Sequence, residues 1–136
     1  MPASASDHAV GLTLTAARAA ADRKGYGAVA IDVSQRLGLT DVFLVLTASN
    51  DRQVRAVVDA VDEALHGAGA VRRAREGLSE ARWVLLDYGD LVVHVLREED
   101  REFYGLERLW KDCPLIALPD EAGPGFDAGQ APEEQR

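Results

Sequence analysis

The sequence of residues 83–110, WVLLDYGDLVVHVLREEDREFYGLERLW, decides the fold class. Its two apolar runs, 83–86 and 91–96, flank the tetrapeptide Asp87-Tyr88-Gly89-Asp90. Aspartate and glycine at such positions are typical of a tight turn between paired strands. The stretch therefore predicts an antiparallel β-hairpin.

A short amphipathic helix is expected directly after the hairpin. The acidic residues 98–100 place negative charge at its start, where the helix dipole favours anions. Gly105 favours a break into two short turns, and residues 112–114, Asp-Cys-Pro, end the helical pattern. Its apolar positions share one face: Phe103, Leu106 and Trp110.

Three more strands are expected upstream of the hairpin. Residues 28–34 (AVAIDVS) alternate between apolar and small or polar side chains, which indicates a strand with one buried face. Residues 42–47 (VFLVLT) are apolar on both faces, as expected for a central strand. Residues 70–75 (AVRRAR) are short and basic, which suits an exposed edge strand.

Two helices are expected between these strands. Ser6 or Asp7 caps the first, which Gly25 ends, and its apolar positions are Val10, Leu14, Ala17 and Ala21. Asn50 and Gln53 have the spacing of a capping box at the start of the second, which Gly67 and Gly69 end. The apolar positions of this second helix are Val54, Val57, Val58, Val61 and Leu65.

The order of these elements predicts an α/β fold, a mixed sheet of about five strands with helices on both faces. At 136 residues the chain is long enough for one domain with a single core. We assign this domain to residues 7–118. Residues 1–6 and the acidic, Pro- and Gly-rich residues 119–136 are expected to be disordered.

Composition restricts the classes of partner. The formal charge of −8 disfavours general or sequence-specific nucleic-acid binding and favours a basic partner. No apolar run approaches the ~20 residues that cross a bilayer, and the first ten residues lack the pattern of a secretory signal. We therefore expect a cytoplasmic location without membrane contact. One cysteine and three dispersed histidines predict neither a zinc site nor any cofactor.

Several residues admit an enzymatic interpretation beside a structural one. His94 could act as a general base, although a hydrogen-bonded structural histidine is favoured. Asp87 and Asp90 could hold a metal, but at that spacing they more often cap backbone N–H groups. Ser49 and Asn50 lie where α/β sheets often bind phosphate, yet no GxGxxG or Walker-type motif accompanies them.

Aromatic residues are concentrated near the C-terminal third. Core packing explains each ring alone, but together with arginines and carboxylates they indicate a contact patch that is partly core and partly surface. The rings in this stretch are Trp83, Tyr88, Phe103, Tyr104 and Trp110.

The chain resembles the ribosomal silencing factor family, RsfS, also called Iojap, over about residues 8–118. The hairpin and the helix after it carry the matches Trp83, Leu86-Asp87-Tyr88-Gly89-Asp90, Val93-His94-Val95, Arg101, Tyr104, Leu106-Glu107 and Leu109-Trp110. The upstream matches are Ile31-Asp32-Val33, Leu39-Thr40-Asp41, Phe43, Ser49-Asn50 and Arg52-Gln53-Val54. Gly105 departs from the bulkier or polar residue of many relatives, and the acidic tail is an addition.

The resemblance implies a nucleotidyltransferase-like fold without catalytic residues. It further implies a homodimeric factor that docks on protein uL14 of the large ribosomal subunit and hinders subunit joining when nutrients are short. The sequence itself lacks the Gly-Ser turn and the Asp-x-Asp strand that a working nucleotidyltransferase needs to hold magnesium and phosphate.

Three hypotheses follow. In the first, the chain is a ribosome-binding factor and no enzyme, with a contact patch formed or supported by Trp83, Asp87, Tyr88, His94, Arg101, Tyr104, Leu106, Glu107 and Trp110. In the second, it is a nucleotidyltransferase-like enzyme that uses Asp87, Asp90 and His94. In the third, it is a homodimeric scaffold whose patch is covered by a second copy.

Overall fold

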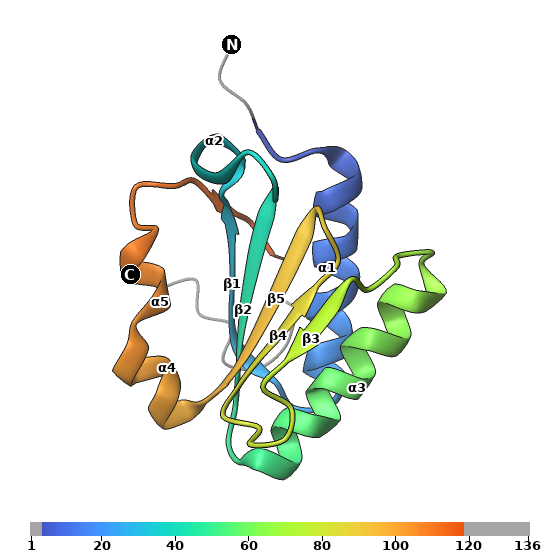
Figure 1. Cartoon of the computed structure of the whole chain (residues 1–136), viewed down its shortest axis with the longest axis vertical. Helices are drawn as coiled ribbons and strands as arrows, with labels where there is room; N and C mark the ends of the chain where they lie inside the picture. Colours follow the sequence, from blue (N-terminus) through green and yellow to red (C-terminus); the bar gives the residue numbers. More distant parts are fainter. Residues whose placement is uncertain (1–3, 119–136) are drawn as a thin grey trace.

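The computed structural model describes residues 4–118, which form one mixed β-sheet with helices on both faces (Figure 1). The predicted fold class is confirmed, with six strands instead of about five. The helices are α1 (Asp7–Asp22), α2 (Ser34–Leu37), α3 (Asp51–Gly67), α4 (Glu98–Tyr104) and α5 (Leu106–Leu109). The strands are β1 (Tyr26–Asp32), β2 (Val42–Ala48), β3 (Ala74–Glu76), β4 (Trp83–Asp87), β5 (Leu91–Arg97) and β6 (Leu115–Ile116).

The strands lie in the order β3-β4-β5-β2-β1-β6. The central strands β2 and β5 are parallel, and the other neighbouring pairs are antiparallel. The short basic strand β3 lies at one edge, as predicted, although it spans three residues instead of 70–75. The hairpin of β4 and β5 and the central place of β2 are likewise confirmed.

Two elements were not predicted, because each is too short for periodicity to reveal it. Strand β6 has two residues and completes the far edge beside β1, where Asp32 N–H also donates to the carbonyl of Pro114 at 2.8 Å. Helix α2 has four residues and ends at Gly38 in the left-handed conformation. Strand β6 depends on its pairing with β1. Helix α2 begins directly after β1, where Asp32 accepts a hydrogen bond from Ser34 N–H.

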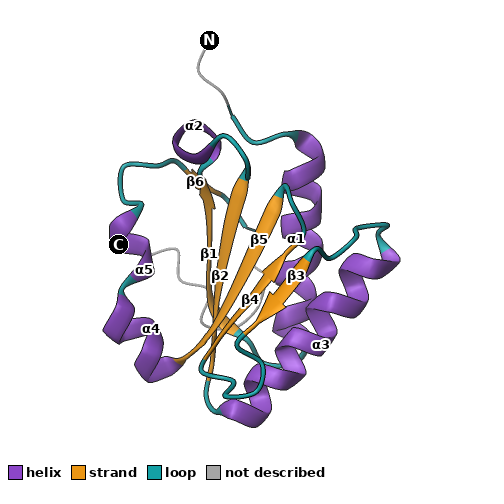
Figure 2. Cartoon of the chain, viewed as in Figure 1, coloured by secondary structure: helices purple, strands orange, loops and turns teal. Residues whose placement is uncertain are grey.

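Helices α1 and α3 lie side by side on one face of the sheet (Figure 2). The predicted face of α3 is confirmed, because all five apolar positions are at most 1% exposed. The predicted face of α1 is only partly correct: Ala17 is buried as predicted, but Val10, Leu14 and Ala21 are half-buried. The buried residues of the helix are Ala9, Leu12, Thr13, Ala16, Ala17 and Ala20. So many alanines fit several helical registers, and close packing on α3 selects the smallest side chains.

The caps show how the helices begin and end. Ser6 accepts a hydrogen bond from Ala9 N–H, and Asn50 accepts one from Gln53 N–H, as predicted. Gly69, at φ 88°, follows the end of α3 as predicted. Gly25 does not end α1, because Lys24 takes the left-handed conformation at φ 68°. Gly25 instead allows close approach, since a Cβ there would lie 3.0 Å from the carbonyl of Ala20.

Helices α4 and α5 lie on the other side of the sheet from α1 and α3 (Figure 2). Gly105, at φ 54°, separates the two as predicted, but the helical stretch ends at Leu109, before the predicted end at 112–114. At the other end of the chain, the N–H groups of Ala5 and Ser6 donate to the carboxylates of Asp32 and Asp41. The expected disordered tail, 119–136, lies outside the described residues.

No helix within residues 4–118 is long and apolar enough to cross a membrane.

Candidate functional site

The side of the sheet that carries α4 and α5 holds four aromatic side chains in mutual contact, which we call the aromatic cluster: Phe43, Trp83, His94 and Trp110. They come from β2, β4, β5 and the segment after α5. Alternation along each strand directs them to this side, while their neighbours Val84, Val93 and Val95 enter the core under α1 and α3. The cluster thus joins three strands and the chain beyond α5.

The rings meet edge to face, as aromatic pairs prefer. The centroids of Phe43 and His94 are 4.9 Å apart at 70°, and those of Phe43 and Trp110 are 5.1 Å apart at 82°. Trp83 and His94 are tilted at 50° with centroids 6.0 Å apart. His94 is 4% exposed, whereas Phe43, Trp83 and Trp110 are half-buried. The cluster therefore has a buried centre and a partly accessible rim.

His94 is a hydrogen-bonded structural histidine, as the sequence favoured. Its Nδ1 accepts a hydrogen bond of 3.1 Å from the indole N–H of Trp83. Burial lowers the pKa of His94 to about 4, so the ring is neutral near pH 7 and carries its proton on Nε2. That Nε2 is buried and finds no hydrogen-bond partner in the described structure.

Two residues of this region were not among the predicted site residues. The guanidinium of Arg36, in α2, lies 5.0 Å from the ring centroid of Trp110, a cation–π contact that joins α2 to the cluster. Phe43 is the one residue of β2 that is not buried. Its position on the same face as Val45 and Thr47 was the available signal, but its neighbours depend on the pairing of β2 with β5.

Arg101 lies where α4 meets the sheet. One of its guanidinium nitrogens donates to the carbonyl of Gly27 at 2.7 Å and to the hydroxyl of Thr47 at 2.5 Å. These bonds tie α4 to β1 and β2 at the end of the sheet where the parallel strands β2 and β5 terminate. Arg101 thus holds in place the segment that leads to Trp110.

Asp87 and Tyr88 belong to the hairpin turn but face different surroundings. Asp87 is half-buried and accepts a hydrogen bond of 2.8 Å from Gly89 N–H, which confirms the turn interpretation. Tyr88 is 7% exposed, packs under α3 and donates its hydroxyl to Asp62 at 2.7 Å. Burial and this bond raise the pKa of Tyr88. The structure therefore brings Trp83, His94 and Trp110 together but leaves Tyr88 on the opposite side.

Three further predicted site residues lie on α4 and α5: Tyr104, Leu106 and Glu107. Their side chains lie outside the described part of the structure.

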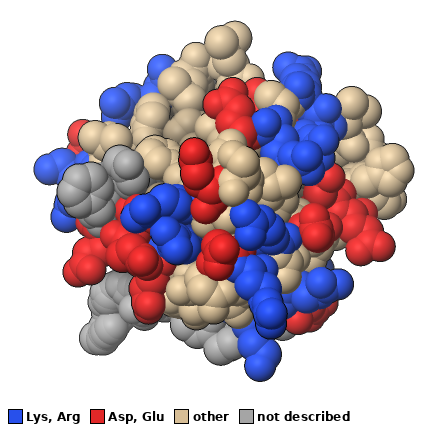
Figure 3. Space-filling view, turned by 60° about the horizontal axis from the view of Figure 1, so that its bottom comes forward, with Lys and Arg blue, Asp and Glu red and all other residues tan. Residues whose placement is uncertain are grey.

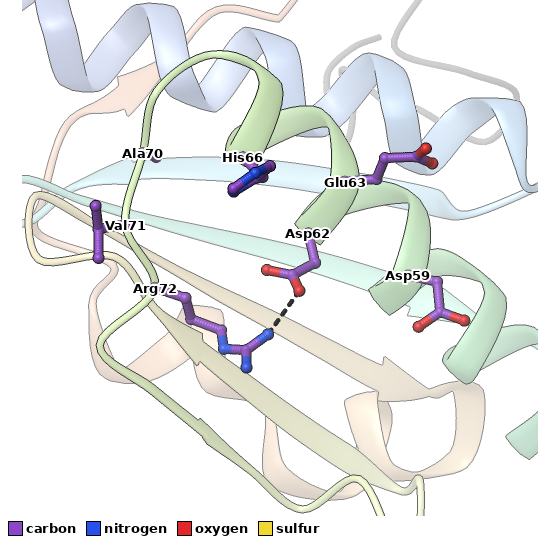
Figure 4. A pocket seen from close by; sticks show the side chains of 7 residues that line it. All are labelled: Asp59, Asp62, Glu63, His66, Ala70, Val71 and Arg72. Atoms are coloured by element: carbon purple, nitrogen blue, oxygen red, sulfur yellow. Dashed lines mark hydrogen bonds and ion pairs between the residues drawn. The ribbon is translucent and has the colours of Figure 1, made fainter.

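A groove of about 490 Å³ lies between α3 and the residues that precede β3 (Figure 4). Asp59, Asp62, Glu63 and His66 line it from α3, and Asp62 pairs with Arg72 at 2.6 Å across it. Within residues 4–118, no three His, Cys, Asp or Glu side chains are placed to hold a metal ion together. The groove thus has a mostly acidic wall on α3, with one of its carboxylates paired to Arg72.

Charged side chains of both signs are interspersed over the face seen in Figure 3, which includes the starts of α3 and α4. Ion pairs account for part of this pattern, among them Arg55 with Asp51 and Arg82 with Asp100. This face therefore presents no continuous field of one sign, and any selectivity there depends on local pairing.

Comparison with known proteins shows the family. The sequence model described as "Ribosomal silencing factor during starvation" matches residues 6–136. The chain belongs to the ribosomal silencing factor family. The ribosomal silencing factor of Bacillus subtilis (strain 168) is 38% identical over 103 residues, which are 76% of this chain and 87% of the relative. The chloroplastic Iojap protein of Zea mays is 29% identical over 106 residues, 76% of this chain and 45% of the relative.

Solved structures agree with this assignment. A protein from Chromobacterium violaceum has a TM-score of 0.73 at 31% identity, covering 86% of this chain and 97% of that chain. A protein from Bacillus halodurans has a TM-score of 0.70 at 32% identity, covering 83% of this chain and all of the other. The chain's bacterial relatives are named ribosomal silencing factors, and their names mention no enzymatic reaction.

Proposed function

We propose that this protein binds ribosomal protein uL14 on the large ribosomal subunit and sterically blocks joining of the small subunit. It thereby represses translation when nutrients are limited. The mechanism makes and breaks no bond: a folded domain of this size occupies the surface that the other subunit needs. Membership of the silencing family and the half-buried aromatic cluster support the proposal together.

The aromatic cluster is the observation that carries the proposal. Large rings held by edge-to-face contacts present apolar area at little entropic cost when a partner docks. Trp83 and Trp110, connected through His94 and Phe43, have the composition of an interface anchor, and Arg36 adds a cation at the rim. We assign direct contact to these side chains and to Asp87 in the adjoining turn.

Three of the other predicted site residues support the contact surface from below or beside it, and three are assigned to it from the resemblance alone. His94 lies under the rings, Arg101 holds α4, and Tyr88 fixes the hairpin turn against α3. Tyr104, Leu106 and Glu107 are proposed as contacts from the sequence resemblance. The formal charge of −8 would speed the encounter with a basic ribosomal protein and orient it.

We further propose a homodimer in the cytoplasm, where its ribosomal partner lies. A second copy would cover part of the exposed apolar surface, which includes Leu37, Leu39, Leu109 and Leu115 at 40%, 88%, 65% and 71% exposure. Sedimentation equilibrium over a dilution series tests this state. A monomer at every concentration would contradict it, and a dimer that buries the aromatic cluster would require docking through another face.

The competing function is a nucleotidyltransferase-like enzyme that uses Asp87, Asp90 and His94. In open α/β sheets, ligands bind beyond the carboxyl ends of the parallel strands. Here the Arg101 side chain occupies that end, and nearby, burial and the neighbouring Glu98 raise the pKa of Tyr26. This arrangement favours a closed polar contact over a nucleotide site. Magnesium-dependent heat on titration with a nucleotide would support the enzyme, and its absence at millimolar ligand would exclude it.

The decisive experiment is reassociation of purified ribosomal subunits, followed by sucrose-gradient sedimentation. Saturating wild-type protein should deplete joined ribosomes and comigrate with large subunits. Trp83→Ala and Trp110→Ala should restore joining, because each removes an anchor ring. Val71→Ala is the matched control, since Val71 is 77% exposed on the side of the groove and outside the cluster. Undiminished subunit joining at saturating wild-type protein would refute the proposal.

A further inference from the structure

The proposed docking surface has an unusual residue at its centre. His94 is 4% exposed, and its Nε2–H is buried without an acceptor among the described residues. An unpaired buried donor costs free energy, whereas a phenylalanine would fill a similar volume without that cost. Packing alone therefore does not account for a histidine at this position.

The Nδ1 atom of His94 supplies what phenylalanine lacks. It accepts a hydrogen bond from the indole N–H of Trp83 at 3.1 Å, while the His94 and Phe43 rings meet edge to face with centroids 4.9 Å apart. Trp83 is the half-buried member of this pair, so the bond connects a fully buried ring to one at the partly accessible rim. This bond restrains the rotation of the indole about its side-chain torsions.

Resting on the proposed function, we propose that His94 is a positioning residue for docking. Through its neutral, Nε2-protonated tautomer it holds the Trp83 indole in the orientation that the partner binds. A tryptophan that is fixed before docking avoids the entropy loss of being ordered by the partner. At neutral pH the contribution of His94 is thus to partner affinity and not to the stability of the fold.

Two substitutions separate the acceptor from the ring. His94→Phe keeps a ring against Phe43 and removes Nδ1, together with the unpaired Nε2–H. His94→Asn keeps an acceptor oxygen at the position of Nδ1 and removes the ring. The control is Val93→Ala, which truncates the neighbouring residue of β5 on the opposite, fully buried side of the sheet.

The experiment combines three measurements on each full-length variant. The chain has two tryptophans, so the indole N–H signals in proton–nitrogen spectra are two and are assigned with Trp83→Phe. Hydrogen exchange of the Trp83 indole reports the bond in the free protein. Urea unfolding reports stability, and binding to isolated large subunits reports affinity.

His94→Phe should accelerate indole exchange and weaken binding roughly three- to tenfold, the loss expected when one side chain must be ordered on docking. Its stability should equal or exceed that of the wild type. His94→Asn should be less stable yet bind more tightly than His94→Phe. Val93→Ala should lower stability without changing the indole signal or the affinity.

The inference is overturned if His94→Phe binds like the wild type, if its indole exchange is unchanged, or if Val93→Ala weakens binding equally. Failure of the wild type to bind large subunits is a different result. It would refute the proposed function and with it the docking role. The exchange measured on the free protein still shows whether His94 holds Trp83.

Discussion

The hydroxyl of Tyr88 donates a 2.7 Å hydrogen bond to Oδ1 of Asp62, whose Oδ2 pairs with Arg72 at 2.6 Å. This relay joins the hairpin turn to α3 and to the segment before β3. It lies on the side of the sheet away from the aromatic cluster, so the hairpin is fixed on one side and carries the half-buried Trp83 on the other.

Tyr88→Phe should therefore cost stability and little else. Removing a buried hydrogen bond to a charged acceptor is expected to lower the free energy of unfolding by about 1–2 kcal/mol. Affinity for large subunits should stay within about twofold of the wild type, because Trp83 keeps its bond to His94. Asp59→Asn, in the same groove but without a bond to Tyr88, is the control in urea titrations. A large loss of affinity would place Tyr88 in the contact itself.

Substitution of Arg101, in contrast to that of Tyr88, should lower affinity for large subunits as well as stability. Arg101→Met removes the bonds to Gly27 and Thr47, so α4 should loosen from the sheet at a cost of roughly 2 kcal/mol. Amide hydrogen exchange in α4 should accelerate more than in α3, and affinity should fall because the segment to Trp110 is less fixed. Glu102→Gln, at an exposed position of the same helix, should leave exchange and affinity unchanged. Equal protection of α4 in both variants would contradict the anchoring role.

Local patterns explain which parts of the fold the sequence could predict. The hairpin turn, the valine-rich face of α3 and the break at Gly105 each depend on residues a few positions apart. The alanine-rich face of α1 does not, because its register is chosen by contact with α3. Strand β6 has two residues and exists only through pairing with β1.

The site was predictable in composition but not in arrangement. Alternation along β4 places Trp83 and Asp87 on one side and would place Tyr88 on the other, a signal that the clustering in sequence obscured. Phe43 joins His94 only because β2 and β5 are parallel with Phe43 opposite Val92. Arg101 reaches Gly27 across 74 positions of sequence. Such non-local contacts are set by topology and leave no local pattern.

Acid should destabilise the fold through His94. Burial holds the pKa of this ring at about 4, against 6.5 when it is exposed on unfolding. Above pH 6.5 both states are neutral, so the full stability is present. As the pH falls from 6.5 to 4, the unfolded chain binds a proton that the folded chain excludes, and the free energy of unfolding should drop by roughly 3 kcal/mol.

Urea titrations of the wild type and His94→Phe between pH 7.5 and 4 check this expectation. The phenylalanine variant lacks the titrating ring, so its stability should fall less over the same window. His8 and His66 are exposed and are present in both proteins, which makes the difference between the two curves specific to His94. Parallel curves would show that another group controls the acid response.

Gly77 and Gly69 distinguish backbone strain from steric overlap. Both have φ of 88°, a left-handed conformation that costs an alanine about 1 kcal/mol. A Cβ at Gly77 would overlap the carbonyl oxygen of Trp83, whereas a Cβ at Gly69 has no described atom within 4 Å. Gly69→Ala should therefore lose only about 1 kcal/mol and retain affinity. Gly77→Ala should lower the free energy of unfolding by at least about 3 kcal/mol. Because the overlap displaces Trp83, the first residue of β4, this variant should also shift the Trp83 indole signal and bind large subunits more weakly. Equal losses of unfolding free energy in the two variants would show that the chain before β4 shifts at little cost and does not fix Trp83.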